Sequence, residues 1–312
     1  MLLFKTIKLP FHIRLKDKTS LRKSTGSITL HSKKYGKTSG NLKNIIIVVL
    51  LGTVVVLSRN IKTEQPERGY KNIFSVEKGT YIKDGFLDEK NMEKNFVPVD
   101  LKMDGTPEIL IFHTHSSEKY SADSDGNVYS VVNAGEKLAE IISEKYNIGV
   151  VHDVSEYDIS EGEVKTEGSY ERSQKGVESL LQKYPDIKIL IDIHRDSFNG
   201  EEINTVSTST GEGAYLMLVN GMCALDDNGE EKSAGVENPY IKQNIAYSYS
   251  LKNKMDSINP NIMKNIYLKP YRYSLNMKPC SFLLEVGNEK NTFAEAEKSL
   301  YDFAQALIES VK

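Results

Sequence analysis

The chain has 312 residues, of which 39% are hydrophobic and 27% charged, so it is long enough for a globular domain with a sizeable core. The chain has 40 basic and 43 acidic residues. The first 44 positions contain 11 of the basic residues and only one of the acidic residues, so a basic head precedes an acidic body. The acidic body argues against a nucleic-acid enzyme, and the two cysteines, Cys223 and Cys280, are too few for a disulfide framework. They could pair across the fold, but two free, buried thiols are the favoured interpretation.

An uncharged, apolar run covers residues 45–57, between Lys43 and Arg59. The run is short for a bilayer, which needs about 20 residues, but the flanking basic side chains can extend it by reaching the headgroups. We predict a basic cytoplasmic head over 1–43 and one transmembrane helix over 44–58, with the N-terminus in the cytoplasm by the positive-inside rule. A buried core element and a cleaved signal peptide are the alternatives, although no Ala-x-Ala-type cleavage pair follows the run.

Residues 59–105 are polar and weakly periodic, which predicts an extracytoplasmic stalk. From residue 106 onward, apolar runs alternate with segments in which apolar residues recur three or four positions apart. These patterns predict strands at 108–112, 148–151, 187–194, 214–219 and 281–287, and helices at 133–146, 175–184, 238–255 and 293–311. The alternation predicts a single α/β domain over 106–312, with a mostly parallel sheet flanked by helices.

Side chains with metal-ligand chemistry occur at three of the predicted strands. His113, His115 and Glu118 follow the first strand, His194 ends the third, and Glu285 lies in the last. In open α/β sheets, ligands bind beyond the carboxyl ends of the strands. We therefore expect these five side chains to lie close together.

The residue types match a hydrolytic zinc site, which has three nitrogen or oxygen ligands and one open position for a water whose pKa falls to about 7. His115 and Glu118, three positions apart in a short turn, can share one ion with His194. Glu285 can take a proton from the water and pass it to a leaving nitrogen. A His-x-x-Glu pair or a lone histidine at a strand end is usually structural, so it is the conjunction at successive strand ends that favours the metal site.

Several neighbours have two open interpretations. Arg195 could stabilise an oxyanion, or form an ion pair with Asp192 or Asp196. Asp192 shares the face of His194 if the strand alternates regularly, so it could orient a histidine. His152 could be a neighbour of the site. Core packing is the favoured role, and a sugar-binding groove the alternative, for four tyrosines: Tyr247, Tyr249, Tyr271 and Tyr273.

Five stretches between residue 106 and the end of the chain resemble the stage II sporulation protein P family of endospore-forming bacteria. They read ILIFHTHSSEKY, SYERSQKGVESLL, ILIDIHRDS, NPYIKQNIAYSYSLKNKM and FLLEVGNEKNT. That family looks like a divergent branch of the zinc N-acetylmuramoyl-L-alanine amidases. The resemblance implies a Zn²⁺ cofactor and hydrolysis of the amide between the lactyl group of muramic acid and the first alanine of the stem peptide. It also implies cutting of peptide cross-links.

The resemblance carries over to single residues. His115 matches the first ligand histidine of the amidases, with His113 as the alternate, and His194 matches the second. Glu285 matches the catalytic glutamate.

The ligand glutamate of the wider amidase family is not matched in place. It comes just before the first helix, where this chain has Asn127, so Glu118 is the best substitute. Arg172 resembles an arginine that precedes a long helix and has no assigned role.

We therefore predict a membrane-anchored zinc amidase that acts outside the cytoplasm on the glycan strands and stem peptides of the cell wall. The resemblance further implies septal remodelling and engulfment during sporulation, beside a lytic transglycosylase, stage II sporulation protein D. A zinc carboxypeptidase-like peptidase or endopeptidase and a non-catalytic scaffold that binds peptidoglycan are the alternatives.

Overall fold

The structure is a computed structural model that describes residues 73–197 and 205–311. The head predicted over 1–43 and the anchor predicted over 44–58 lie outside these residues. Among the residues described, no helix has the length and apolar character needed to cross a membrane.

The described elements follow one another in this order: β1 (Phe74–Val76), α2 (Glu89–Asn95), β2 (Pro107–Phe112), α3 (Val131–Tyr146), β3 (Gly149–His152), β4 (Ile159–Ser160), β5 (Glu163–Val164), α4 (Ser169–Lys183), β6 (Ile189–Asp196), β7 (Thr205–Thr208), β8 (Gly211–Ala214), β9 (Leu216–Gly221), β10 (Ala224–Asp227), β11 (Glu230–Ser233), α5 (Ile241–Ile258), β12 (Ile266–Lys269), β13 (Ser281–Asn288) and α6 (Phe293–Ser310).

Seven of the strands form one sheet in the order β1-β12-β9-β13-β6-β2-β3. Five of its six strand pairs are parallel, and β9 with β13 is the antiparallel pair. The other strands form three small antiparallel hairpins. The predicted α/β fold with a mostly parallel, helix-flanked sheet is therefore confirmed.

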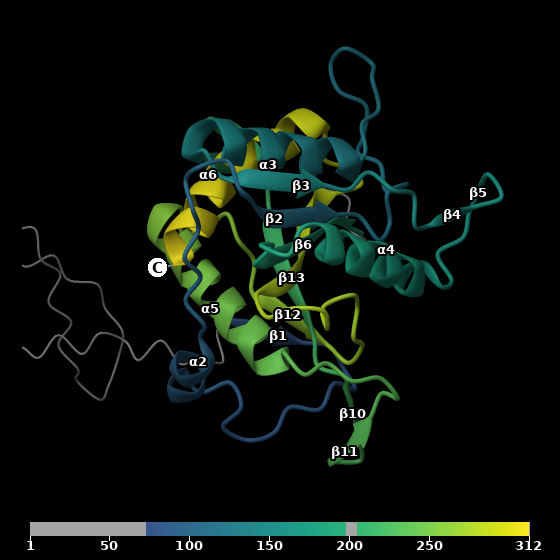
Figure 1. The fold of residues 1–312 in the computed structure, drawn as a ribbon, viewed down its shortest axis with the longest axis vertical. Coiled ribbons are helices and arrows are strands. Elements are labelled where there is room, and N and C mark those ends of the chain that lie inside the picture. The colour runs from purple at the N-terminus through teal and green to yellow at the C-terminus, as the bar shows by residue number, and fades with distance from the viewer. Residues whose placement is uncertain (1–72, 198–204, 312) are drawn as a thin grey trace, which may run out of the picture. The chain divides into compact units, whose positions relative to one another are not determined.

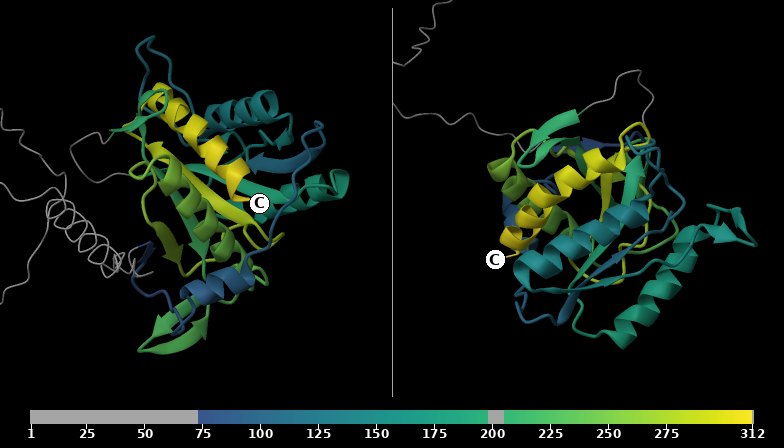
Figure 2. Two further views of the ribbon diagram at one scale, coloured as in Figure 1. Left: turned by 90° about the vertical axis from the view of Figure 1, so that its left-hand side faces the viewer. Right: turned by 90° about the horizontal axis from the view of Figure 1, so that it is seen from above.

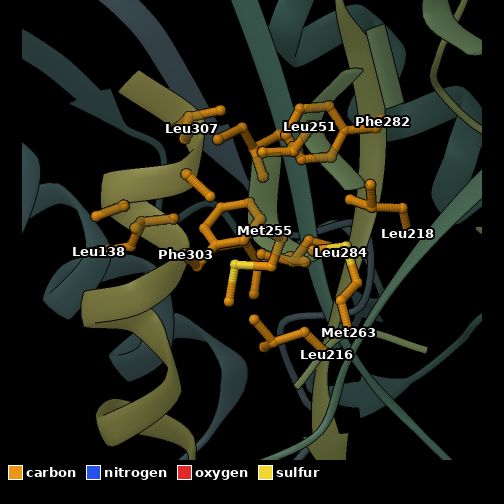
Figure 3. Close-up of a cluster of buried hydrophobic side chains, with 14 of the residues drawn as sticks. Leu138, Leu216, Leu218, Leu251, Met255, Met263, Phe282, Leu284, Phe303 and Leu307 are labelled. Carbon is orange, nitrogen blue, oxygen red and sulfur yellow. The ribbon is translucent and has the colours of Figure 1, made fainter. Parts of the chain in front are cut away.

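Three helices, α3, α5 and α6, pack on one face of this sheet (Figures 1 and 2). Alternate strand residues point into this layer, where they meet apolar helix side chains. Figure 3 shows part of the cluster, with side chains from β9, β13, α5 and α6: Leu216, Leu218, Phe282, Leu284, Leu251, Met255, Phe303 and Leu307. Each such side chain contributes about 1.5–3 kcal/mol when fully buried, so this layer is the main core.

The helix α4 packs on the opposite face, over β2, β6 and part of β3. A second, smaller cluster joins Val177 of α4 to Leu110 and Phe112 of β2 and Leu190 of β6. The helix begins at Ser169, six residues before the predicted start, because its first turn is polar and escapes an apolar pattern. That first turn lies next to the candidate site.

The described part of the predicted stalk packs against the α/β domain. Residues Phe74–Val76 form β1, which pairs in parallel with β12. In α2, Met92 is buried in the main core. The segment from residue 73 to 105 is thus joined to the sheet by backbone hydrogen bonds and by apolar packing.

Candidate metal centre

The turn after β2 positions two of the predicted ligands. β2 is fully buried from Glu108 to Phe112, and the chain then turns through His113 to Glu118. Asp192 of β6 fixes this turn, because its carboxylate accepts hydrogen bonds from the Thr114 amide at 2.9 Å and the Thr114 hydroxyl at 2.7 Å. Asp192 is itself fully buried and is the register partner of Phe112, so it holds the turn at the carboxyl end of β2.

The structure brings His115, Glu118 and His194 together. One ligand atom from each lies within 4.8 Å of the other two. The Nδ1 atom of His115 is 3.5 Å from Oε1 of Glu118, and Nδ1 of His194 is 3.4 Å from Oε2. The two imidazole rings are nearly perpendicular, with centroids 5.0 Å apart. The three side chains could therefore share one divalent ion.

The charges inside this cluster are strongly coupled. Burial by itself would raise the pKa of Glu118, but His194, His115 and the amide of Arg195 together bring it well below its usual range. Burial would lower the pKa of His194, but Asp192 and Glu118 raise it well above its usual value. A half-buried carboxylate that attracts positive charge this strongly is suited to a cation.

Glu285 lies beside the cluster on the neighbouring strand. In the parallel pair of β13 and β6, Glu285 is the register partner of His194, so both side chains point to the α4 face. Burial raises the pKa of Glu285 to about 8. Its Oε2 atom is buried and has no hydrogen-bond partner among the described residues, so the site leaves this oxygen free for a ligand.

The ring of each ligand histidine has a partner on its far side. Nε2 of His194 lies 3.0 Å from Oδ1 of Asp192, although the N–H is poorly aligned for a hydrogen bond. Nε2 of His115 is 3.1 Å from the hydroxyl of Ser169, at the start of α4. Both contacts leave Nδ1 facing Glu118, as a metal site requires.

A buried aspartate in the loop before α4 holds the stretch between the two ligands of the turn. The carboxylate of Asp158 accepts hydrogen bonds from the Ser116 hydroxyl at 2.8 Å, and from both the amide and the hydroxyl of Ser117. Arg172 secures this loop by donating to three of its backbone carbonyls, at residues 157, 165 and 167. Arg172, for which the sequence suggested no role, therefore has a structural function in this loop.

His113 points away from the ligand group and is fully buried. Its Nδ1 is 3.1 Å from the carbonyl of Ile193, and its Nε2 is 2.9 Å from Nε2 of His152. Gly135 of α3 makes room for this pair, because a Cβ there would lie 2.6 Å from Nε2 of His113. Both histidines therefore belong to the packing between α3 and the sheet.

Arg195 lies at the rim of the cluster. Among the described residues its guanidinium forms no ion pair with Asp192 or Asp196, although Nη1 donates to the backbone carbonyl of Asp196 at 3.4 Å. The backbone amide of Arg195 donates to Glu118 at 2.9 Å, and its Nε donates to the carbonyl of Lys119 at 3.0 Å. Nη1 is 3.8 Å from the carboxylate of Glu289. Asp196 instead pairs with Lys264 at 3.7 Å.

Two imidazoles and one carboxylate, with a further carboxylate free beside them, are the donors that hydrolytic zinc sites use. The residues present therefore fit a metal ion. Sequence reasoning missed Asp158 and Ser169, which touch the ligand turn from distant segments.

The family model described as stage II sporulation protein P matches residues 54–308. The chain belongs to the stage II sporulation protein P family. A comparison with curated proteins found no match.

Solved structures of three amidases are distantly similar to this member of the stage II sporulation protein P family. The N-acetylmuramoyl-L-alanine amidase AmiC2 of Nostoc punctiforme is 12% identical, with 67% of this chain and 96% of that one covered and a TM-score of 0.38. The N-acetylmuramoyl-L-alanine amidase of Clostridium difficile 630 is 14% identical, with 67% and 96% covered and a TM-score of 0.39. The apo form of Ami1 from Mycobacterium abscessus is 10% identical, with 65% and 96% covered and a TM-score of 0.38.

Proposed function

We propose that the protein is a zinc-dependent peptidoglycan hydrolase that cuts the N-acetylmuramoyl-L-alanine amide bond during sporulation. Membership of the sporulation family supports the cell-wall role. The observation that carries the chemistry is the His115–Glu118–His194 group, with the free carboxylate of Glu285 in register beside His194. This arrangement supplies three ligands and one proton carrier, which together suffice for amide hydrolysis.

His115, Glu118 and His194 would hold the zinc ion. When bound, zinc would polarise the scissile carbonyl and lower the pKa of a water molecule. Glu285 takes a proton from the attacking water as the new C–O bond forms, and gives it to the amide nitrogen as the C–N bond breaks. A cation nearby would bring the pKa of Glu285 down from about 8, so that the carboxylate is ionised at neutral pH. In this proposal, the positive charge of Arg195 acts from the rim of the cluster to stabilise negative charge on the carbonyl oxygen.

The test compares the wild-type chain with Glu285→Gln on purified peptidoglycan, with mass spectrometry of the products. We expect the wild type to release stem peptides with an intact amino-terminal alanine, and the variant to bind one zinc ion but to be about 10²–10⁴-fold slower. Glu297→Gln, on α6 at the other face of the sheet, is the matched control and should stay active. Unchanged turnover in Glu285→Gln would end this assignment.

The same products separate the other candidate functions. Stems shortened at their carboxyl ends but still attached to glycan would indicate a carboxypeptidase, and split cross-links would indicate an endopeptidase. Peptidoglycan binding without any product would indicate a scaffold.

The membrane location also remains a proposal. It rests on the apolar run within 44–58 and on the 11 basic residues that precede it. Membrane fractionation followed by external protease treatment should show a membrane-bound chain whose catalytic domain is digested in intact protoplasts. Association with the transglycosylase, stage II sporulation protein D, is a prediction from the resemblance, and copurification tests it.

A further inference from the structure

The sheet face that carries Glu285 is unevenly covered. Over β2 and β6 it lies beneath α4, whereas α3, α5 and α6 all pack on the other face. Among the described elements, no helix covers this face over β9, β12 and β1. The floor of the candidate site therefore continues beyond Glu285 as a sheet surface without a helix above it.

Strand alternation identifies the side chains on this face. Val219 of β9 and Leu283 of β13 point to it and are buried, so its accessible part consists of Met217, Tyr267 and Lys269. Met217 of β9 is the register partner of Glu285 and is half-buried. In β12, Ile266 and Leu268 are buried in the main core, while Tyr267 and Lys269 between them are half-exposed. Tyr267 is in register with Val219, two positions from Met217, so its ring shares the face of Glu285.

The open face carries little unpaired charge at these strands. Nζ of Lys269 lies 3.7 Å from the carboxylate of Glu77 and 5.1 Å from the centroid of the Tyr267 ring. Met217 beside Glu285 and the half-exposed ring of Tyr267, two strands from Glu285, thus remain as the uncharged groups of the accessible part of this face. This chemistry suits a ligand with apolar C–H surfaces and uncharged hydroxyl or amide groups.

A row of tyrosine rings forms a wall along this face. The ring of Tyr170 lies 5.4 Å from that of His115 and 5.3 Å from that of Tyr273, edge to face in both cases. Tyr271 continues the row at 6.1 Å from Tyr273, and 56% of its surface is exposed. The row leads from a candidate metal ligand to solvent.

The backbone of this wall is held in an uncommon conformation close to the sheet. Tyr273 has a φ of 53°, in the left-handed region that bulky residues rarely adopt. A Cβ on Gly221 of β9 would lie 2.3 Å from the carbonyl oxygen of Tyr271, so only glycine permits this approach. The hydroxyls of Tyr271 and Tyr273 make no hydrogen bonds within the described part of the chain. Strain of this kind is tolerated at binding and catalytic sites.

We propose that the open face of β9 and β12, with the wall of Tyr271 and Tyr273, binds the glycan strand of peptidoglycan. This inference rests on the proposed function, and it assigns a binding surface to the glycan strand from which the stem peptide is cut. The C–H faces of pyranose rings pack against Tyr267 and Tyr271, and sugar hydroxyl and acetamido groups meet the free tyrosine hydroxyls. In this arrangement Met217 lies on the strand between Tyr267 and Glu285, and Glu285 receives the amide to be cut.

The test measures how much the enzyme prefers long strands. The full-length chain, purified in detergent, is assayed on long glycan strands that carry stems and on a single disaccharide that carries one stem. We expect Tyr267→Ala and Tyr271→Ala together to lower the ratio of kcat/KM between long and short substrates about tenfold, through KM for the long strand. Phenylalanine at both positions should restore most of the ratio. Met103→Ala is the matched control, since Met103 is 54% exposed and precedes β2, which lies toward the opposite end of the sheet from β12.

A binding measurement separates this inference from the proposed function. Peptide-free strands of alternating N-acetylglucosamine and N-acetylmuramic acid are titrated calorimetrically into the wild type and into the double alanine variant. We expect at least a tenfold weaker Kd in the variant. An equal Kd, or an unchanged kcat/KM ratio, would overturn the glycan face even if the enzyme is an amidase. If the wild type cuts a different bond but the variant still loses glycan binding, the proposed function fails and the glycan face stands.

Discussion

Removal of the Asp158 carboxylate should weaken zinc binding, although Asp158 is not itself a candidate ligand. Asp158 is fully buried and accepts three hydrogen bonds from Ser116 and Ser117, the two residues between ligands His115 and Glu118. A hydrogen bond to a charged group contributes about 1.5–3 kcal/mol, so the three set an upper bound of about 5–9 kcal/mol for Asp158→Ala. Because water can enter and the turn can relax, we expect a loss of about 3 kcal/mol in unfolding free energy and a 10–100-fold weaker zinc Kd.

Two further variants make this experiment specific. Asp158→Asn keeps the size of the side chain and leaves one oxygen for the Ser117 amide, while the serine hydroxyls can rotate to accept from the new NH₂ group, so most zinc affinity should return. Asp153→Ala is the matched control: Asp153 is also buried and accepts three hydrogen bonds, but from Ser155 and Tyr157. Competition with a chelating dye gives the Kd, and urea unfolding in EDTA gives the apo stability. Wild-type zinc affinity in Asp158→Ala would refute the positioning role, as would an equal loss of affinity in Asp153→Ala.

Three further outcomes are expected. Asp192→Asn should weaken zinc binding 10–100-fold by dye competition, because the carboxylate beside the second ligand histidine also fixes the ligand turn. Gly135→Ala should destabilise the fold by about 1 kcal/mol in urea unfolding, because overpacking against His113 costs about 1–3 kcal/mol and the better helix propensity returns about 1 kcal/mol. Burial raises the pKa of Cys223 to about 11 and that of Cys280 to about 12, so in the folded protein both thiols should resist iodoacetamide at pH 8, and the rate should rise with pH up to those values. Rapid labelling of the folded protein at pH 8 would contradict the last expectation.

The elements that the sequence predicts are those with a strong apolar period. β2, β6, β9 and β13 each contain a short, largely apolar run, and α3, α5 and α6 carry apolar stripes, so each can be recognised from the local sequence. The strands β1 and β12 have only three and four residues and are too short for a period to stand out. The antiparallel pairing of β9 with β13 is determined by the tertiary structure, and no local pattern in either strand predicts it.

In the candidate site too, some residues can be predicted from local sequence patterns and others cannot. His115, Glu118, His194 and Glu285 were found because each sits in or just beyond a recognisable strand. Asp158 was missed because it reaches the ligand turn from about 40 positions along the chain, inside a loop with no period of its own. The separate role of His113 could not be predicted from the sequence either. His113 and His115 are two positions apart, and only the conformation of the turn determines which of the two rings points to the ligand group.

The topology explains why the site lies where it does. The chain leaves β2 through α3 to reach β3 on one side, and it leaves β6 toward β9 on the other. The carboxyl ends of β2 and β6 are thus a switch point, where connections part and leave a crevice. α4 connects β3 back to β6, in the opposite direction along the sheet from the β2–α3–β3 connection, so a right-handed crossover puts α4 on the opposite face from α3. It covers β6, β2 and part of β3. Because β13 follows β12 through an antiparallel connection, no crossover helix is needed there. The face beside Glu285 therefore has no crossover helix above it. If this face binds the glycan as proposed, a helix added over β9 and β12 should block cleavage of long strands before it blocks cleavage of a single disaccharide.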